Sequence, residues 1–297
     1  MQQTATASSP KTISSSLYTA LALLFTLLWA SAFMAVKVGL RSSPPLFLMA
    51  VRFLIAGALL LLWSRLRGYS FPRSPREWAR VVLIGLLNNA GYLGVAGLAL
   101  RNLSGGMGAV IASTNPLMLA MVAPLFLRER LTPVKVTGFL LAFGSVFAVM
   151  YTRTGSANQP GAMALMLFAN ALMVTGTILF KRWAPRQELT VMNGVQLLAS
   201  GLVLMVPSLL LEPVAAVGWN LSLLGAVAYL ALAVSCGAMI IWYQLLRTGD
   251  ASKASAFFFL NPVVGLFLGA LLLGEPLYGF DLVGTVGVAA GIYMVQR

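Results

Sequence analysis

The segment NPLMLAMVAPLFLRERL (Asn115–Leu131) has a counterpart, NPVVGLFLGALLLGEPL (Asn261–Leu277), 146 residues later in the chain. In both, Asn-Pro opens an apolar run and a glutamate follows fourteen residues after the Asn. A shift of 146 residues aligns the two segments without a gap, and a shift of 144 aligns earlier ones more weakly, for example Gly57 with Gly201. The sequence therefore predicts an internal duplication.

Composition indicates a membrane protein. The chain is 59% hydrophobic and 9% charged, whereas a soluble domain carries about 25% charged residues. Apolar residues gather in runs of about 20, the length that crosses about 30 Å of hydrocarbon as a helix. The ten predicted spans are residues 17–37, 46–64, 80–99, 106–127, 134–151, 161–181, 190–210, 220–244, 254–273 and 279–296.

Basic residues predict the orientation. Fifteen of the 20 Lys and Arg residues fall on one side of the spans and four on the other, and Arg52 lies within a span. By the positive-inside rule both termini are cytoplasmic. The net charge of +13 then reflects topology and contact with anionic lipid, and the basic residues lack the aromatic interleaving of nucleic-acid platforms. We expect the lipid bilayer as a partner and no nucleic acid.

An odd number of spans in each half inverts the second half relative to the first. We therefore predict an all-α polytopic membrane protein, with ten transmembrane helices as two inverted five-helix repeats around a central cavity. Inverted repeats are typical of carriers whose site opens to either side, although duplication can also simply build a larger bundle. The predicted divisions are a disordered cytoplasmic tail (1–16), a first repeat (17–151), a periplasmic linker (152–160) and a second repeat (161–297).

The Asn-Pro pairs predict hinges. Pro116 and Pro262 each remove a backbone donor and disfavour helix at the preceding residue. The amides of Asn115 and Asn261 either bond to the backbone at the kink or line a substrate path.

The acidic residues argue against proton coupling and catalysis. Glu129 and Glu275 lie about 20 Å beyond the Asn-Pro pairs, so we interpret them as gate or interfacial ion-pair residues. All seven acids lie at span ends or in loops and there is no His, so facilitated transport or exchange is favoured over proton antiport. Triads, metal clusters and phosphate loops are not found, so the sequence predicts neither an enzyme nor a metal or cofactor.

Aromatic and uncharged polar residues within the spans favour a cavity for a small amphipathic molecule. Each has a plainer alternative, an interhelical hydrogen bond or a place in an interfacial aromatic belt. Arg52, Asn193 and Gln196 are costly in a membrane unless they face protein or water. The predicted cavity residues are Trp29, Phe33, Lys37, Asn88, Tyr92, Asn115, Asn170, Thr177, Lys181, Gln196, Trp242, Tyr243 and Asn261, with Lys37, Lys181 and Gln196 as charge or carboxylate contacts.

A family resemblance covers nearly the whole chain. LLWASAFMAVKVGL (Leu27–Leu40), RFLIAGALLL (Arg52–Leu61) and the Asn-Pro segments with LFLRERLT and LLLGEPL resemble the EamA-type branch of the drug/metabolite transporter superfamily. Within it the chain is most similar to YddG-type amino-acid exporters of bacterial inner membranes. The resemblance implies a basket of ten helices around a central cavity. The sixth span, LMLFANALMVTG, lacks the Trp often seen in the second repeat.

We therefore expect an alternating-access exporter of small amphipathic metabolites, mainly neutral amino acids, in the bacterial inner membrane. It would act as a monomer or weak oligomer. The alternatives are a carrier of drugs or nucleotide sugars, and a structural or signalling membrane protein. A cationic drug should require a mid-membrane acid, which the sequence lacks.

Overall fold

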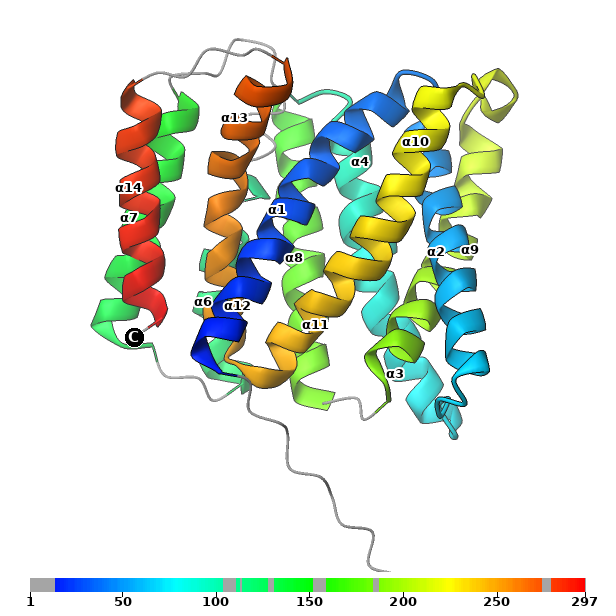
Figure 1. Ribbon diagram of the computed structural model, residues 1–297, viewed down its shortest axis with the longest axis horizontal. Helices are drawn as coiled ribbons and strands as arrows, with labels where there is room; N and C mark the ends of the chain where they lie inside the picture. The colour runs from blue at the N-terminus through cyan, green and yellow to red at the C-terminus, as the bar shows by residue number, and fades with distance from the viewer. Residues whose placement is uncertain are drawn as a thin grey trace, which may run out of the picture.

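The protein is described by a computed structural model that covers residues 14–103, 111–112, 114–127, 131–151, 159–183, 187–273 and 279–296. Within these residues every regular element is helical and no strand occurs (Figure 1). The helices run between the two ends of one bundle. We call the end where the first helix begins, at Ser15, the lower end, and the end where it finishes, at Leu40, the upper end.

Helical structure lies along the predicted spans in the described residues, apart from Thr114 and Asn220. The first half contains α1 (Ser15–Leu40), α2 (Pro45–Leu66), α3 (Pro75–Gly85), the π-helix η1 (Leu86–Gly94), α4 (Val95–Ala99), α6 (Asn115–Leu127) and α7 (Pro133–Tyr151). The second half contains α8 (Pro160–Trp183), α9 (Leu189–Leu211), the short η2 (Val214–Ala216), α10 (Leu221–Tyr229), the π-helix η3 (Leu230–Ala238), α11 (Met239–Thr248), α12 (Ala251–Ala256), the 3₁₀ turn η4 (Phe257–Phe259), α13 (Leu260–Leu273) and α14 (Gly279–Gln296).

The outer surface of the bundle is apolar. Leu125, Leu221 and Leu271 are 78%, 85% and 81% exposed. Within the described residues, six helices or continuous helical series are long and apolar enough to cross a membrane, and three more apolar helices are shorter. Exposed leucines of this kind suit contact with lipid, because soluble proteins rarely expose large apolar patches.

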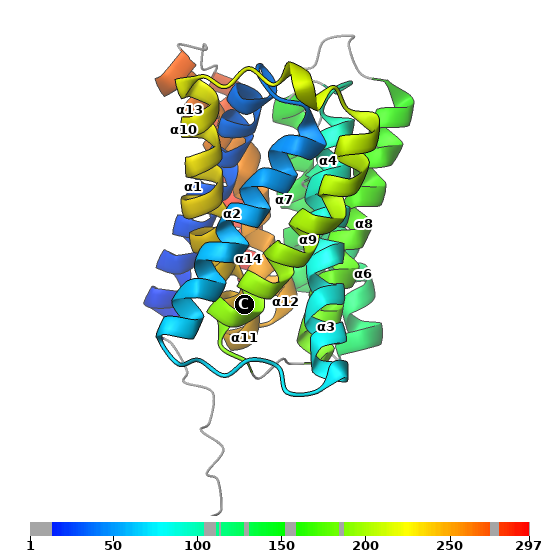
Figure 2. The same cartoon turned by 90° about the vertical axis from the view of Figure 1, so that its right-hand side faces the viewer.

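Two glycines let α2 and α9 cross in close contact (Figure 2). A Cβ atom at Gly57 would lie 2.6 Å from the backbone nitrogen of Leu198, and one at Gly201 would lie 2.9 Å from that of Leu54. The contact is reciprocal, because each glycine lies 144 residues from its counterpart, as does each leucine. Small residues permit this close approach of helix backbones in a membrane.

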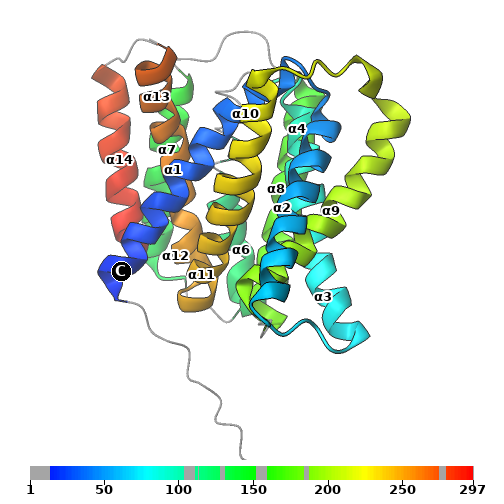
Figure 3. The same ribbon diagram turned by 45° about the vertical axis from the view of Figure 1, so that its right-hand side comes forward.

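A second close pair is formed by α7 and α14, which lie side by side at the left of Figure 1. A Cβ atom at Gly138 would lie 2.7 Å from the carbonyl oxygen of Gly291, and one at Gly291 would lie 2.6 Å from that of Gly138. Between the two pairs, α1 contacts both α13 and the α10–α11 series (Figure 3).

The two π-helices occupy equivalent places in the two halves. η1 and η3 start 144 residues apart, the same shift that relates Gly57 to Gly201. A π-helical stretch within an α-helix is rare and frequently marks a functional site.

Both Asn-Pro pairs lie in the first turn of a helix, and the second follows the 3₁₀ turn η4 with no non-helical residue between them. α6 begins at Asn115, so Pro116 is its second residue, and Pro262 is the third residue of α13, directly after η4. Proline is tolerated in the first helical turn because the amide donor that it lacks has no partner there. The predicted ninth span is accordingly divided into α12, η4 and α13.

The upper ends of α2 and α9 are joined by a carboxylate. Glu212, at the end of α9, accepts hydrogen bonds from the backbone nitrogens of Leu46 and Phe47 at 3.0 and 2.9 Å. Ser208 donates to the same carboxylate at 3.0 Å. The first turn of α2 therefore receives a negative cap from α9, where the helix dipole favours one.

Candidate functional site

A small cavity lies in the upper half of the bundle, where α1, α2, η1, α4 and η3 meet. Its volume is about 40 Å³, which has room for a few water molecules and not for an amino acid. An organic solute would therefore enter it in a more open conformation. The cavity is lined by Trp29, Ala32, Phe33, Val36, Met49, Arg52, Tyr92, Leu93, Ala96, Gly97, Leu100 and Val234.

The cavity has an aromatic wall. The rings of Trp29 and Tyr92 are nearly parallel, at an interplanar angle of 6° and a centroid distance of 6.5 Å. Phe33 lies one helical turn after Trp29 on the same helix. Three residues that the sequence predicted for the cavity, Trp29, Phe33 and Tyr92, are thus brought together.

An aromatic cluster of Phe25, Trp29, Trp242 and Phe258 lies between this cavity and the lower end. Phe25 stacks on Trp29 and on Trp242 with centroid distances of 5.4 Å in each case. Phe258, in η4, meets Trp242 edge to face at 5.1 Å. Trp242 contributes to this cluster and does not line the cavity.

Arg52 forms the charged part of the cavity wall. Its side chain is 2% exposed, and its Nε donates to the hydroxyl of Ser235 at 3.1 Å. Its guanidinium group also lies over the ring of Phe53, 5.0 Å from the centroid. The sequence indicates that Arg52 is costly in a membrane but does not predict it as a cavity residue. Among the basic residues within the predicted spans it lies farthest from a span end, and that position was the available signal.

Three predicted cavity residues form a polar bridge instead. Tyr243 donates to Gln196 Oε1 at 2.6 Å, and Asn88 donates weakly to the Tyr243 hydroxyl at 3.5 Å. The ring of Tyr243 also stacks on Phe180 at 4.9 Å. These contacts join η1, α9, α11 and α8 away from the cavity lining.

Asn170 bonds to the backbone beside the first Asn-Pro pair. Its Nδ2 donates to the carbonyl oxygen of Ile111 at 2.6 Å and to Thr114 Oγ1 at 3.1 Å. The Ile111 carbonyl oxygen also accepts from the backbone nitrogen and the hydroxyl of Thr114, at 3.0 and 2.7 Å, so Asn170 of α8 joins a turn that is already hydrogen-bonded. These contacts use the Asn170 amide nitrogen, and its Oδ1 has no partner among the described residues.

The two predicted lysine contacts lie outside the cavity lining. Lys181 donates to the carbonyl oxygens of Leu246 and Gly249 at 2.9 and 2.6 Å, where α11 ends. Lys37 is exposed in the last turn of α1. Neither lysine faces the aromatic wall.

The other predicted residues are dispersed. Asn115, Asn261 and Thr177 are buried but do not line the cavity. Asn115 Nδ2 and Asn261 Oδ1 have no partner among the described residues, so their amides keep free hydrogen-bonding capacity. Glu129 and Glu275 lie outside the described residues.

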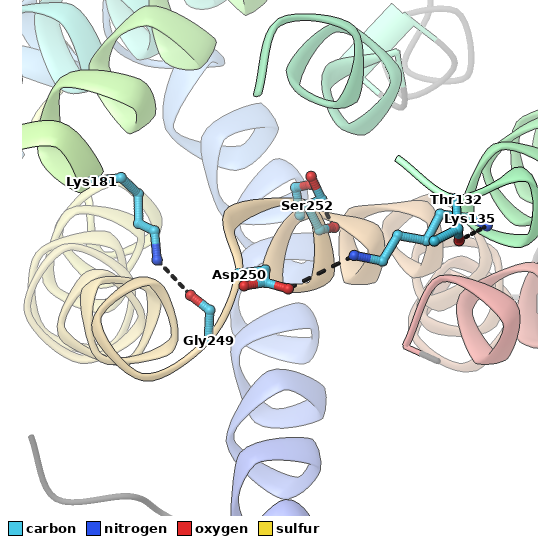
Figure 4. A network of polar contacts seen from close by, with 7 residues as sticks. Thr132, Lys135, Lys181, Gly249, Asp250 and Ser252 are labelled. Carbon is cyan, nitrogen blue, oxygen red and sulfur yellow. Dashed lines mark hydrogen bonds and ion pairs between the residues drawn. The ribbon is translucent and has the colours of Figure 1, made fainter. Parts of the chain in front are cut away.

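The loop between α11 and α12 is held from two sides at the lower end (Figure 4). Lys181 of α8 binds Gly249 O, and Lys135 of α7 lies 3.8 Å from Asp250 Oδ2. These contacts tie the loop before α12 to α8 and α7.

A bundle of apolar helices around a small, mainly apolar cavity with an aromatic wall and one buried charge is typical of a multi-pass membrane transporter. The chain belongs to the EamA-like transporter family, whose model matches residues 16–151 and again residues 161–297.

Relatives agree with this assignment, and a solved structure has the same fold. The chain is 30% identical to an uncharacterized transporter of Archaeoglobus fulgidus, over 91% of this chain and 95% of the relative. It is 32% identical to the uncharacterized inner membrane transporter YedA of Escherichia coli K12, over 84% and 81% of the two chains. A crystal structure shares the fold, with a TM-score of 0.82 and 22% identity over 95% of this chain and 97% of its own. The relatives are named transporters and not enzymes.

Proposed function

We propose that this transporter exports amino acids, mainly neutral ones and the aromatic ones among them, together with related small metabolites. The observation that carries the proposal is the cavity itself. It combines the aromatic surfaces of Trp29, Phe33 and Tyr92 with one buried cation, Arg52. A small solute with an apolar side chain and an acidic group complements such a wall.

An inverted repeat would supply the two conformations that export needs. The family model matches twice, and the two π-helices and the reciprocal Gly57 and Gly201 contacts share one shift of 144 residues. An odd number of spans in each half would invert the second half. Two inverted halves support alternating access, because exchanging their conformations turns the site from one side to the other.

The 3₁₀ turn η4, directly before α13, would act as a hinge for this exchange of conformations. Phe258 of the aromatic cluster lies in η4, four residues before Pro262. A rotation at this turn would carry Phe258 away from Trp242, to which it is packed at 5.1 Å. That motion would open the cavity toward the lower end, and Pro116 would act equivalently in the first half.

The lower end would face the cytoplasm. Most Lys and Arg residues flank the spans on that side, and both termini then lie inside. Residues 152–160 would form a linker on the opposite, periplasmic side. The name of the YedA relative supports the bacterial inner membrane as the location.

Transport would proceed as facilitated movement or exchange. Four acids have described side chains, Glu77, Glu188, Glu212 and Asp250, and none of them lines the cavity. A proton-coupled carrier normally places a titratable group near its site.

Growth on a toxic analogue tests the proposal. Cells that express the protein should tolerate a fluorinated phenylalanine and release preloaded phenylalanine faster than cells without it. Tyr92→Ala should lower this efflux at least about fivefold, because it removes roughly 1.5–3 kcal/mol of ring contact. Tyr293→Ala, at a 58% exposed position on α14, is the matched control. Equal efflux from Tyr92→Ala and wild-type cells, at equal amounts of protein in the membrane, would argue against the site.

A further inference from the structure

We infer that Arg52 binds the carboxylate of the transported solute, so that the site selects small carboxylic acids with an apolar side chain and does not require their amino group. This inference rests on the proposed passage of such solutes through the cavity. It goes further, because it names the group that is recognised and the residue that recognises it.

Arg52 retains unused donors in the cavity wall. A guanidinium group has five N–H donors. Nε donates to Ser235 Oγ at 3.1 Å and Nη1 contacts the Sδ atom of Met49 at 3.6 Å, and the other three N–H groups have no partner among the described residues. The unused donors belong to Nη1 and Nη2, the two nitrogens at the end of the side chain.

The end of a guanidinium group matches a carboxylate. One N–H from Nη1 and one from Nη2 can bind the two oxygens in parallel, a geometry in which Arg binds more specifically than Lys. A buried cation without a counter-charge is unfavourable, and no acid forms an ion pair with Arg52 among the described residues. A bound carboxylate would supply that counter-charge.

The cavity lining offers no acidic group for an ammonium ion. Apart from Arg52 its side chains are apolar or aromatic, with the Tyr92 hydroxyl the other strongly polar group. The site therefore distinguishes the two ends of an amino acid. Removal of the carboxylate should abolish binding, and removal of the amino group should not.

Ser235 and Asn193 hold Arg52 in place. Asn193 Nδ2 donates to the backbone carbonyl of Ser235 at 2.7 Å, within the π-helix η3. The Ser235 hydroxyl then accepts from Arg52 Nε, which leaves the outer edge of the guanidinium group toward the cavity. Ser235 and Asn193 are positioning residues.

Thermal unfolding of the purified full-length protein in detergent tests this inference. A ligand that binds the folded state raises the melting temperature. Three probes with the same ring are compared: 3-phenylpropionate, phenylalanine and phenethylamine. We expect 3-phenylpropionate and phenylalanine to stabilise the wild-type protein, and phenethylamine to have at least about tenfold weaker apparent affinity. Equal stabilisation by the amine and the acid would overturn the inference.

Variants add a second test. Arg52→Gln should weaken 3-phenylpropionate binding about tenfold to a hundredfold, and Arg52→Lys should bind with intermediate affinity. Arg101→Gln removes an exposed cation after α4 and should bind as the wild type does. Unchanged binding to a folded Arg52→Gln protein would overturn the inference. If Arg52→Gln does not fold, the comparison of probes on the wild-type protein still tests recognition of the carboxylate, and Arg52→Lys tests the residue.

The two proposals can fail separately. If 3-phenylpropionate binds in an Arg52-dependent manner but phenylalanine is not transported, the carboxylate site stands and amino-acid export is wrong. If phenylalanine is transported but phenethylamine binds as well as the acid, export stands and the role of Arg52 is wrong.

Discussion

Lys135 and Asp250 connect the two family-matched parts of the chain at the lower end of the bundle, with Nζ and Oδ2 3.8 Å apart. The side chain of Lys135 is 9% exposed and that of Asp250 is 49% exposed. An ion pair with a half-exposed partner contributes less than about 1 kcal/mol. Such a contact is weak enough to break and re-form in each transport cycle.

Neutralisation of this pair should favour opening of the lower end. Asp250→Asn should increase the labelling rate of a cysteine at Ser252, which is 1% exposed, by up to about fivefold, the factor that corresponds to about 1 kcal/mol. The measurement uses a polar maleimide on inverted membrane vesicles. Cys236 is the only cysteine of the chain, so Cys236→Ala removes the background. A charge exchange, Lys135→Asp with Asp250→Lys, should restore slow labelling. Equal labelling rates in all variants would contradict a role of the Lys135–Asp250 ion pair in holding the lower end.

Lys181 should contribute to stability and not to substrate affinity. Its two hydrogen bonds to the carbonyl oxygens of Leu246 and Gly249 cap the end of α11. Lys181→Gln should reduce the free energy of unfolding by about 1–3 kcal/mol and lower the melting temperature, with no change in phenylalanine affinity. Arg182→Gln, an exposed neighbour, is the control. A weaker affinity at unchanged stability would support the expectation from the sequence that Lys181 contacts substrate.

The crossing of α2 and α9 should not tolerate added side-chain atoms. Gly57→Ala and Gly201→Ala each place a Cβ within 3 Å of backbone on the other helix, and each should cost about 1–3 kcal/mol of stability. Gly225→Ala on α10 meets nothing within 4 Å and should not lower the melting temperature. Thermal unfolding of the three variants checks this, and a melting temperature for Gly57→Ala equal to that of Gly225→Ala would contradict the close packing.

The carboxylate of Glu212 should stabilise the start of α2. Glu212→Gln replaces one acceptor oxygen with an amino group that faces a backbone N–H of Leu46 or Phe47. We expect a loss of about 1–2 kcal/mol, seen as a lower melting temperature. Glu212→Asp keeps the charge and should retain part of the effect. An unchanged melting temperature for Glu212→Gln would show that water replaces the cap at no cost.

The helices and the residues of the aromatic wall could be predicted from the sequence. Apolar runs near 20 residues fix the spans because the bilayer sets their length. Trp29 and Phe33 share one face of their helix because they are four residues apart, and the sequence predicts Tyr92 for the same cavity. Span length and the face on which an aromatic residue lies are properties of single helices, so the local sequence pattern is enough to predict them.

The roles of the polar residues could not be predicted, because they depend on contacts between helices. Asn170 and Asn88 both lie within predicted spans, yet Asn170 donates to the carbonyl oxygen of Ile111 and Asn88 donates to the hydroxyl of Tyr243. The direction in which Arg52 points also depends on Ser235, 183 residues away. Spacing along the chain carries no information on such partners.

Counterflow tests the central claim most directly. Proteoliposomes that contain the purified protein and a high internal concentration of unlabelled phenylalanine are diluted into a trace of labelled phenylalanine. Export by alternating access predicts transient accumulation of label above its equilibrium level, unaffected by a protonophore and absent from protein-free liposomes. If phenylalanine, threonine and methionine all fail to accumulate in this assay, the assignment of amino acids as substrates is wrong.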